Sequence, residues 1–482
     1  MTKLVAACAV GVPCLVGVAI GTGHGIESIA VLVVSLFLAM GLLDWRRSIY
    51  GLLAYLPFSG IPIIASHPRT GLAVLAKDVL FVVPAYLGFL GARVAGHGRS
   101  ALRSRLLVPL AFLAVLVLAQ AFNPSLPNRL VGAIGVKVWL FYVPLLVLGY
   151  HLIRDRRDLN RVLAVMSIAA VVPVLVGLAE AIAIYSGRAA LVYRWYGAAA
   201  SAATQDFAEL AVEGGATLRR VPSTFSFVAQ YFAFTVAMVA VTYAWWRGVL
   251  RHTRWSIVGL VLWTLVMLAG LLSGARAAFF FIPLLMVFLL LIERGTARIP
   301  LGRLLTVSAV IPTAVALFGG NLTETLRHVT QLSGHYFDQL FLQGLQQGLA
   351  TTVFGLGSGM DTSASRYAFS ASSGFSAVGG IWYESWFVKT VLELGIAGLV
   401  LVVLIFSMIT AEALRRHGRL RDPDLKAISA ALLALIVWNI VYCIKGQYLD
   451  IDPMNVYFWL FAGILAAIPR LDQEQGAHGA RG

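Results

Sequence analysis

One carboxylate, Glu384, stands where a polar stretch of the sequence runs into an apolar one. It lies in Tyr383-Glu384-Ser385-Trp386, directly before a long apolar segment. A carboxylate that is partly removed from water at a helix mouth would have a raised pKa. Such a group is suited to act as a general base. The alternative is an acidic residue that only complements the positive end of the helix dipole.

Two arginine clusters could bind an anion. Arg219 and Arg220 are adjacent and precede an apolar run, and Arg276 lies in Ser273-Gly274-Ala275-Arg276, a tight turn between two apolar runs. Guanidinium groups bind phosphate with two parallel hydrogen bonds, and an arginine between apolar helices usually has a specific partner. The alternatives are an arginine pair that reaches the lipid head groups and a turn that Arg276 holds together through backbone carbonyls.

Three further sequence patterns are weaker indications of a functional site. The run Gly355-x-Gly357-x-Gly359 lacks the lysine and the strand context of a nucleotide loop, so we interpret it as a turn that lets backbone approach closely. Asp450-Ile451-Asp452 resembles a metal-binding DxD, but two solvated loop carboxylates are the favoured interpretation. Glu180 and Glu393 lie in or near apolar spans and could pair within the helix bundle. No His/Cys cluster indicates a metal site.

The elements that position these residues are membrane helices. Of 482 residues, 59% are apolar and 12% are charged, and the mean hydropathy is +0.84. Apolar runs of about 17–25 residues, each long enough to cross a bilayer, recur along the chain. We therefore predict an all-α, polytopic transmembrane helix bundle of about 14 spans, near residues 4–20, 27–43, 49–65, 77–92, 106–122, 135–152, 162–185, 225–246, 255–272, 278–293, 303–319, 385–409, 427–444 and 455–469.

The distribution of basic residues predicts an orientation. In this arrangement 24 of the 37 Lys and Arg residues fall in one set of loops and in the tails, which places both termini in the cytoplasm. The chain then divides into 1–319 (helices 1–11, with an outer loop 186–224), a long outer loop 320–384, and 385–482 (helices 12–14 and a cytoplasmic tail). The net charge of +15 follows mainly from this orientation, and no basic-aromatic module indicates nucleic-acid binding.

The long outer loop carries an amphipathic pattern over 326–349, which predicts a helical cap on the membrane surface. His335 lies in it and is either a second candidate base or an ordinary interfacial histidine. Arg327 and Arg366 also lie in this outer loop. Because the orientation signal does not require arginines on the outer side, we count them with Arg219 and Arg220 as candidate substrate-binding residues.

Four segments in this order resemble the O-antigen ligase and polymerase-like superfamily of bacterial membrane proteins. The first half of the chain matches that superfamily mainly by hydropathy. The four segments are Arg220–Phe225 with the following Ala229-Gln230-Tyr231, Leu272–Ala278, Phe354–Gly359, and Glu384–Leu399.

The resemblance implies a multi-pass protein of the bacterial inner membrane that transfers glycans from undecaprenyl diphosphate at the periplasmic face. An acceptor hydroxyl would attack the anomeric carbon with inversion. The arginines, Arg276 included, would hold the diphosphate, while Glu384 or His335 would take the hydroxyl proton. Tyr383 and Trp386 would stack on sugar rings. No cofactor or metal is expected; the expected partners are the glycan donor, the acceptor and the bilayer, and other polysaccharide assembly proteins could take part.

The pair Glu384-Ser385 departs from the resembling ligases, which carry a His-Asn type pair at this place. This difference favours a polymerase that joins repeat units into an exopolysaccharide or O-antigen. A ligase that attaches finished glycan to lipid or protein is the closest alternative. A transporter or flippase, which often shows internal repeats and interrupted helices, and a purely structural subunit are the alternatives from other classes.

Overall fold

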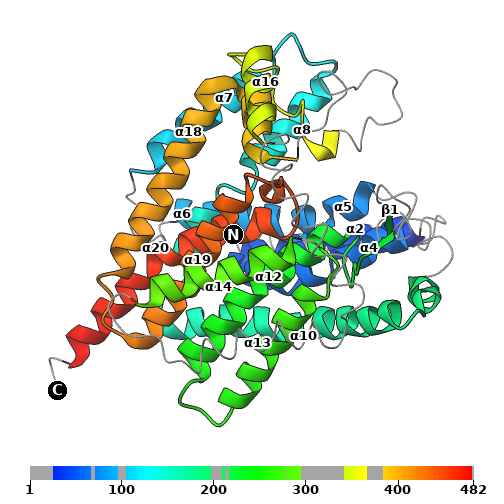
Figure 1. Ribbon diagram of the computed structural model, residues 1–482. Helices are drawn as coiled ribbons and strands as arrows, with labels where there is room; N and C mark the ends of the chain where they lie inside the picture. The colour runs from blue at the N-terminus through cyan, green and yellow to red at the C-terminus, as the bar shows by residue number, and fades with distance from the viewer. Residues whose placement is uncertain are drawn as a thin grey trace. The chain divides into compact units, whose positions relative to one another are not determined.

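The computed structural model describes residues 25–66, 71–95, 105–196, 209–211, 217–275, 277–294, 341–365 and 384–479 (Figure 1). Apart from turns and connections, these residues are helical, with one antiparallel pair of three-residue strands, β1 (Glu209–Ala211) and β2 (Thr217–Arg219). The chain forms two compact units. Unit 1 comprises residues 1–101, 190–206 and 224–226, and unit 2 comprises residues 102–189, 207–223 and 227–482.

Unit 1 is built from short helices that proline and glycine separate. The Asp44 side chain accepts a hydrogen bond from the Arg46 N–H at 3.1 Å and so caps α3. Pro57 lies in a 3-10 turn that ends the α3 segment, so the predicted span 49–65 is interrupted. The elements of unit 1 are α2 (Gly25–Leu43), α3 (Trp45–Tyr55), η1 (Leu56–Phe58), α4 (Gly60–Ala65), α5 (Gly71–Lys77), the π-turn η2 (Asp78–Val82) and α6 (Val83–Val94).

Unit 2 packs its helices around α12, whose residues are buried almost without exception. Because α12 is apolar on every face, neighbouring helices are expected to surround it. The elements of unit 2 are α7 (Leu107–Gln120), α8 (Arg129–Leu140), α9 (Leu145–Leu152), α10 (Arg156–Tyr185), α12 (Val228–Trp245), η3 (Trp246–Leu250), α13 (Ser256–Leu271), α14 (Ala278–Arg294), α16 (Gln343–Thr351), α18 (Trp386–His417), α19 (Pro423–Tyr442), η6 (Tyr448–Asp450) and α20 (Met454–Gly479), with β1 and β2.

The described residues contain seven helices that are long and apolar enough to cross a membrane, and four shorter apolar helices. The seven are 73–94, 129–152, 156–185, 228–250, 386–417, 423–442 and 454–473. The predicted spans 4–20 and 303–319 lie outside the described residues, and every other predicted span overlaps a helix. The prediction of a helical membrane protein therefore agrees with the structure.

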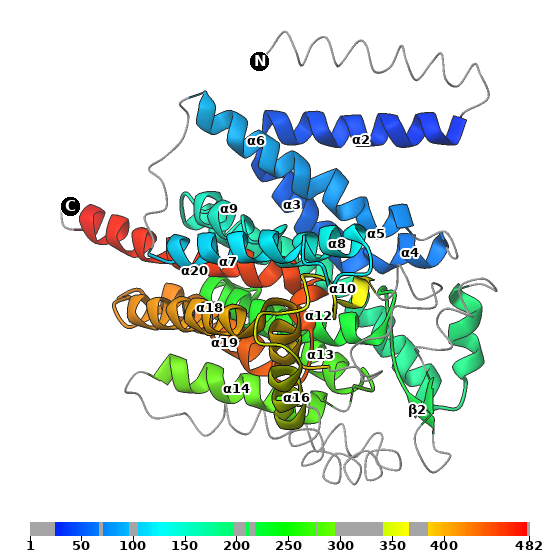
Figure 2. The same cartoon turned by 90° about the horizontal axis from the view of Figure 1, so that it is seen from above.

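The described part of the amphipathic stretch is helical as well. Phe341 and Leu345 pack against Val388 and Leu392, which lie in the first turns of α18. Figure 2 shows α16 beside the beginning of α18. The apolar face of α16 is therefore directed at α18.

The arginine-rich connections of unit 2 meet at one end, called here the arginine end. Arg156, the first residue of α10, donates to Asp422 at 2.7 Å and to Asp424 at 2.8 Å, at the beginning of α19. Arg416, near the end of α18, donates to the Ala466 carbonyl in α20. Glu384 lies at the other end of α18, just before its first residue, and the glycine run bonds to α18 near that end; we call that side the loop end.

Candidate active site

The glycine run at the loop end docks into a break in α18. Gly395 has φ +70° and ψ −167°, which is not helical. The carbonyls of Leu392 and Glu393, which would bond to N–H groups four residues on in a regular helix, accept the N–H groups of Leu356 at 2.7 Å and Gly357 at 3.2 Å. The N–H of Ile396 donates to the Val353 carbonyl at 3.0 Å. The loop thus supplies the hydrogen bonds that the break would otherwise lose.

Glycine is required on both sides of this contact. Gly355 has φ +93°, and a Cβ there would lie 2.6 Å from the Glu393 carbonyl oxygen. A Cβ on Gly395 would lie 2.3 Å from the Val353 carbonyl oxygen. The expectation that the run lets backbone approach closely is confirmed, and the partner is the chain's own helix.

Two side chains at the end of α7 hold the run from the other side. The Gln120 side-chain amide donates to the Phe354 carbonyl. Asn123 donates to the Gly355 carbonyl at 3.1 Å and to the Gln120 amide oxygen at 2.7 Å. The Ser358 N–H donates to the Gln120 carbonyl at 3.2 Å. The run is therefore fixed between α7 and α18.

A buried carboxylate lies directly before the break. Glu393 is fully buried, and its Oε2 accepts the indole N–H of Trp139 at 2.6 Å. Its Oε1 accepts the Asp361 N–H at 2.8 Å and the Thr362 hydroxyl at 3.0 Å. Three donors from two other segments therefore satisfy Glu393 and join α8, the residues after the glycine run, and α18.

A second buried charge lies one turn earlier in α18. The Lys389 side chain is 0% exposed and forms an ion pair with Asp450, whose side chain is 5% exposed. The Lys389 ammonium also lies 4.8 Å from the centre of the Trp139 ring, a cation–π distance. Trp386 donates its indole N–H to the other carboxylate oxygen of Asp450 at 2.8 Å. Burial raises the pKa of Asp450, and the hydrogen bonds and positive charge from Lys389 and Trp386 oppose that shift.

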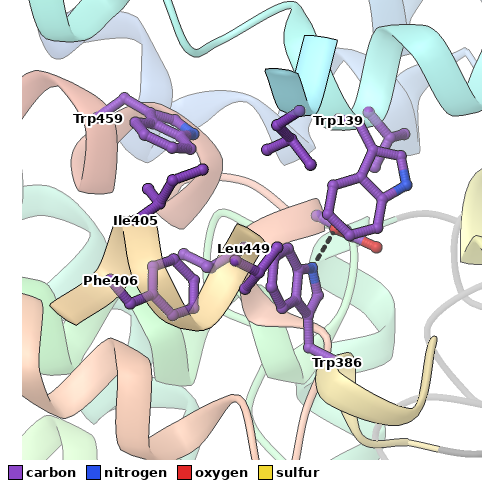
Figure 3. Close-up of a pocket in the computed structure, with 10 residues that line it drawn as sticks. Trp139, Trp386, Ile405, Phe406, Leu449 and Trp459 are labelled. Carbon is purple, nitrogen blue, oxygen red and sulfur yellow. Dashed lines mark hydrogen bonds between the residues drawn. The ribbon is translucent and has the colours of Figure 1, made fainter. Parts of the chain in front are cut away.

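A small cavity borders this pair (Figure 3). Its volume of about 20 Å³ has room for a single water molecule. Figure 3 shows Trp139 and Trp386 close together, and the dashed line marks the hydrogen bond that the Trp386 indole N–H donates to Asp450. A cavity of this size cannot hold a sugar or a lipid chain, so the candidate site lies elsewhere. The lining residues are Leu113, Val138, Trp139, Trp386, Val402, Ile405, Phe406, Leu449, Asp450 and Trp459.

Glu384 lies at the open side of the network. Its carboxylate is 36% exposed and lies 4.0 Å from the Lys445 ammonium, which is 32% exposed. Two charged groups influence the pKa of the Tyr448 phenol. Burial raises the pKa of its phenol, a hydrogen bond with Tyr442 lowers it, the charge of Glu384 raises it, and the charge of Arg220 lowers it. Arg220 and Glu384, which are far apart in the sequence, therefore act on the same phenol.

The Arg220 segment is joined to the turn that carries Arg276. The Val221 N–H donates to the Ser273 carbonyl at 3.0 Å. Ser223 has φ +51°, and its N–H donates to the buried Glu180 carboxylate at 2.8 Å. Glu180 thus holds a strained residue next to Arg220, and the pairing within the bundle that the sequence indicated for Glu180 is present.

Several predicted site residues cannot be placed. Arg276, His335, Arg327, Arg366 and Tyr383 lie outside the described residues. Arg219 is the last residue of β2. Glu384 lies just before α18 at the loop end, and Arg220 directly follows β2.

The surroundings of Trp386 differ from the prediction. It is 6% exposed, it stacks on Phe406 with ring centres 5.6 Å apart, and Trp139 lies 4.9 Å away. With neighbours on its ring and its N–H bound to Asp450, this placement favours a packing role over sugar stacking.

The interpretation of Asp450 as a solvated loop carboxylate is wrong. Its side chain is buried against Lys389 and Trp386, whereas Asp452 accepts a hydrogen bond from Asn455 at 2.8 Å. Lys389 was not identified from the sequence. Its spacing of four residues before Glu393 places both charges on one face of an apolar helix, and a charge pair within such a helix is a functional signal.

No family model matches the chain, and no curated protein matches it. In the part of the chain that the structure describes, no group of three or more His, Cys, Asp or Glu side chains could hold a metal ion.

Proposed function

We propose that the protein is a glycosyltransferase that polymerises undecaprenyl-diphosphate-linked oligosaccharide repeat units into an exopolysaccharide or O-antigen. It would do so in the bacterial inner membrane, at the periplasmic face, with about fourteen spans and both termini in the cytoplasm. The observation that supports this most is that the charges of Glu384 and Arg220, far apart in the sequence, both act on the Tyr448 phenol. The Val221 N–H, next to Arg220, also bonds to Ser273 in the turn that leads to Arg276.

In this proposal the arginines bind the diphosphate of the donor. Arg220 and Arg276 would stabilise the negative charge that grows as undecaprenyl diphosphate leaves. Glu384 would accept the proton of the attacking acceptor hydroxyl. The bond from the anomeric carbon to the diphosphate oxygen breaks as the bond to the acceptor oxygen forms, with inversion. Glu384 is about one-third exposed, so acceptor and solvent can reach it.

One observation favours a transporter as the second candidate. The apolar helix α18 is interrupted at Gly395 and carries the buried charges Lys389 and Glu393. Interrupted helices with buried charges are typical of ion and substrate sites in transporters. A ligase that transfers finished glycan shares the proposed chemistry and differs in the acceptor.

Reconstitution with a lipid-linked repeat unit separates these functions. The purified protein in vesicles is given undecaprenyl-diphosphate-linked oligosaccharide, and the products are resolved by size. A ladder of longer glycans on the lipid supports polymerisation, and a single transfer to another added acceptor supports the ligase. Movement of the donor between leaflets without a new glycosidic bond would refute the proposal and support the transporter.

A further inference from the structure

The connection between α19 and α20 is attached at both ends to the beginning of α18. At its first residue, the Cys443 carbonyl accepts the Trp386 N–H at 3.0 Å and the Ser385 hydroxyl at 3.2 Å. At its other end, Asp450 binds Lys389 and the Trp386 indole. The first turn of α18 and its cap therefore hold the stretch Cys443–Asp450 of this connection, called here the α19–α20 loop.

The middle of the α19–α20 loop is attached to the segment after the glycine run. Gln447 donates to the Asp361 carboxylate at 3.2 Å and accepts the Ser363 hydroxyl at 3.3 Å. The Asp361 N–H in turn donates to Glu393. Polar contacts thus connect the loop to the α18 break on one side and to the first turn of α18 on the other.

Within this loop, Lys445 approaches Glu384 directly, and the charge of Glu384 raises the pKa of the Tyr448 phenol. Lys445 forms the 4.0 Å ion pair with Glu384. The Tyr448 ring stacks on Tyr442, with centres 4.2 Å apart and planes 14° apart, which fixes its direction. The loop therefore forms a wall of the candidate site, and its placement decides where Lys445 and Tyr448 stand.

A buried ion pair is a costly way to hold such a loop. Removing an ammonium and a carboxylate from water costs free energy that their attraction often only partly offsets, and an apolar pair of similar volume often gives equal stability. An apolar pair would not fix direction, however, because packing is not directional. Lys389 must point at Asp450, and Asp450 must also accept the Trp386 N–H.

We propose that Lys389 and Asp450 are positioning residues that set the α19–α20 loop in register with α18 and so hold Lys445 beside Glu384. The catalytic consequence rests on the proposed function, while the geometric consequence does not. The ligand of this wall would be the phosphate-bearing donor, which Lys445 can contact as a second cation beside Arg220.

The test measures the distance between Glu384 and Lys445 directly. A water-soluble carbodiimide couples a carboxylate and an amine into an amide only when they touch, and mass spectrometry quantifies the linked peptides. We expect the Glu384–Lys445 link in the full-length protein. In the double variant Lys389→Met/Asp450→Leu, which removes both charges at similar volume, its yield should fall about tenfold, as when a coupling of typical strength between neighbours is lost.

A matched variant breaks an ion pair at the arginine end instead. Arg156→Met should leave the yield unchanged, because Arg156 contacts Asp422 and Asp424. Should the double variant fail to elute as a single species, Asp450→Asn decides, since asparagine still accepts the Trp386 N–H but removes the charge. If the variant that folds gives as much Glu384–Lys445 link as the wild-type protein, the proposal is overturned.

A second readout connects the loop to catalysis. With the lipid-linked donor, the double variant should both lower kcat and raise KM, because the displaced loop moves Lys445 away from Glu384 and from the donor phosphate, whereas Arg156→Met should change neither. If the wild-type protein makes no polymer but the link depends on Lys389 and Asp450, the proposed function fails and the positioning role stands. If polymer forms but the link is unaffected in the double variant, only the positioning role fails.

Discussion

The backbone carbonyl of Glu393 accepts the N–H of Gly357 at 3.2 Å, from a segment 36 residues earlier in the chain, whereas the partner in a regular helix would be Ala397. This bond exists because α18 leaves helical geometry at Gly395. The glycine run is therefore part of the helix that carries the buried charges, and damage to the run should disturb both.

Gly395→Ala should destabilise the protein. Its φ of +70° is strained for alanine, and the new Cβ would lie 2.3 Å from the Val353 carbonyl oxygen. The conformational strain alone costs about 1–3 kcal/mol, and the clash adds to it. Thermal unfolding in detergent measures the loss.

The matched control for Gly395 is Gly418→Ala. Gly418 has φ −61°, and the nearest atom to its Cβ would be 3.6 Å away. We expect a change within about 0.5 kcal/mol. Equal effects of the two substitutions would contradict the role of the break.

Glu393→Gln should destabilise the protein although the shape is kept. The carboxylate faces three donors, from Trp139, Asp361 and Thr362, and glutamine replaces one acceptor oxygen with an NH₂ group. One buried donor then loses its acceptor, at a cost of about 1–3 kcal/mol. Glu412→Gln, at a partly exposed ion pair with Arg416, should change the free energy of unfolding by less than about 1 kcal/mol. A smaller loss in the free energy of unfolding for Glu393→Gln than for Glu412→Gln would contradict this account.

Glu384→Gln should lower turnover while the donor still binds. If Glu384 is the general base, kcat falls by about 10²–10⁴-fold, with little change in the affinity for donor. Because Glu384 is partly exposed, the substitution should leave thermal stability nearly unchanged. If the variant kept the wild-type turnover, His335 or Asp361 would become the candidate base. An effect confined to KM would indicate that Glu384 binds the acceptor.

Arg276→Ala should abolish glycan assembly while the protein stays folded in the membrane. Arg276→Lys should restore little activity, because an ammonium cannot reproduce the two parallel hydrogen bonds of a guanidinium to phosphate. Arg294→Ala, at the end of α14, is a control on the same helix hairpin and should retain activity. Full activity in Arg276→Ala would remove this arginine from the site.

The ion pair at the arginine end predicts a dependence of stability on pH. Partial burial by itself would raise the pKa of Asp422, but hydrogen bonds from the Leu425 N–H, the Arg156 guanidinium and the Asp424 N–H outweigh it and hold the pKa below its usual 3.8. A carboxyl whose pKa is lowered on folding contributes stability that is present above its unfolded pKa and is lost as the pH falls through its folded pKa.

Asp422→Asn isolates this contribution. Asparagine still caps α19 but loses the charge that faces Arg156. The wild type should be more stable than the variant at pH 6, and the difference should shrink as the pH is lowered below about 4. A difference in thermal unfolding that stays constant over this range would show that Asp422 acts only as a cap.

The helices could be predicted because they are long and apolar. The glycine run could be predicted as a place of close backbone approach, but the break at Gly395, which is its partner, could not. Periodicity does not indicate that Gly357 bonds to Glu393, since that contact depends on a helix break that a single glycine, Gly395, makes possible. Asp450 was misjudged for a related reason. A carboxylate in a short connection is usually solvated, and only the packing of α18 against that connection buries it with Lys389.

The arrangement of the site has a consequence for synthesis. Lys389 is made about sixty residues before its counter-ion Asp450, and Trp139 about 250 residues before its acceptor Glu393. During insertion, α18 therefore carries the Lys389 ammonium before its counter-ion Asp450, in the α19–α20 loop, has been synthesised. A chain stopped after α19 would leave this charge exposed to lipid, so we expect membrane quality control to recognise such products through α18.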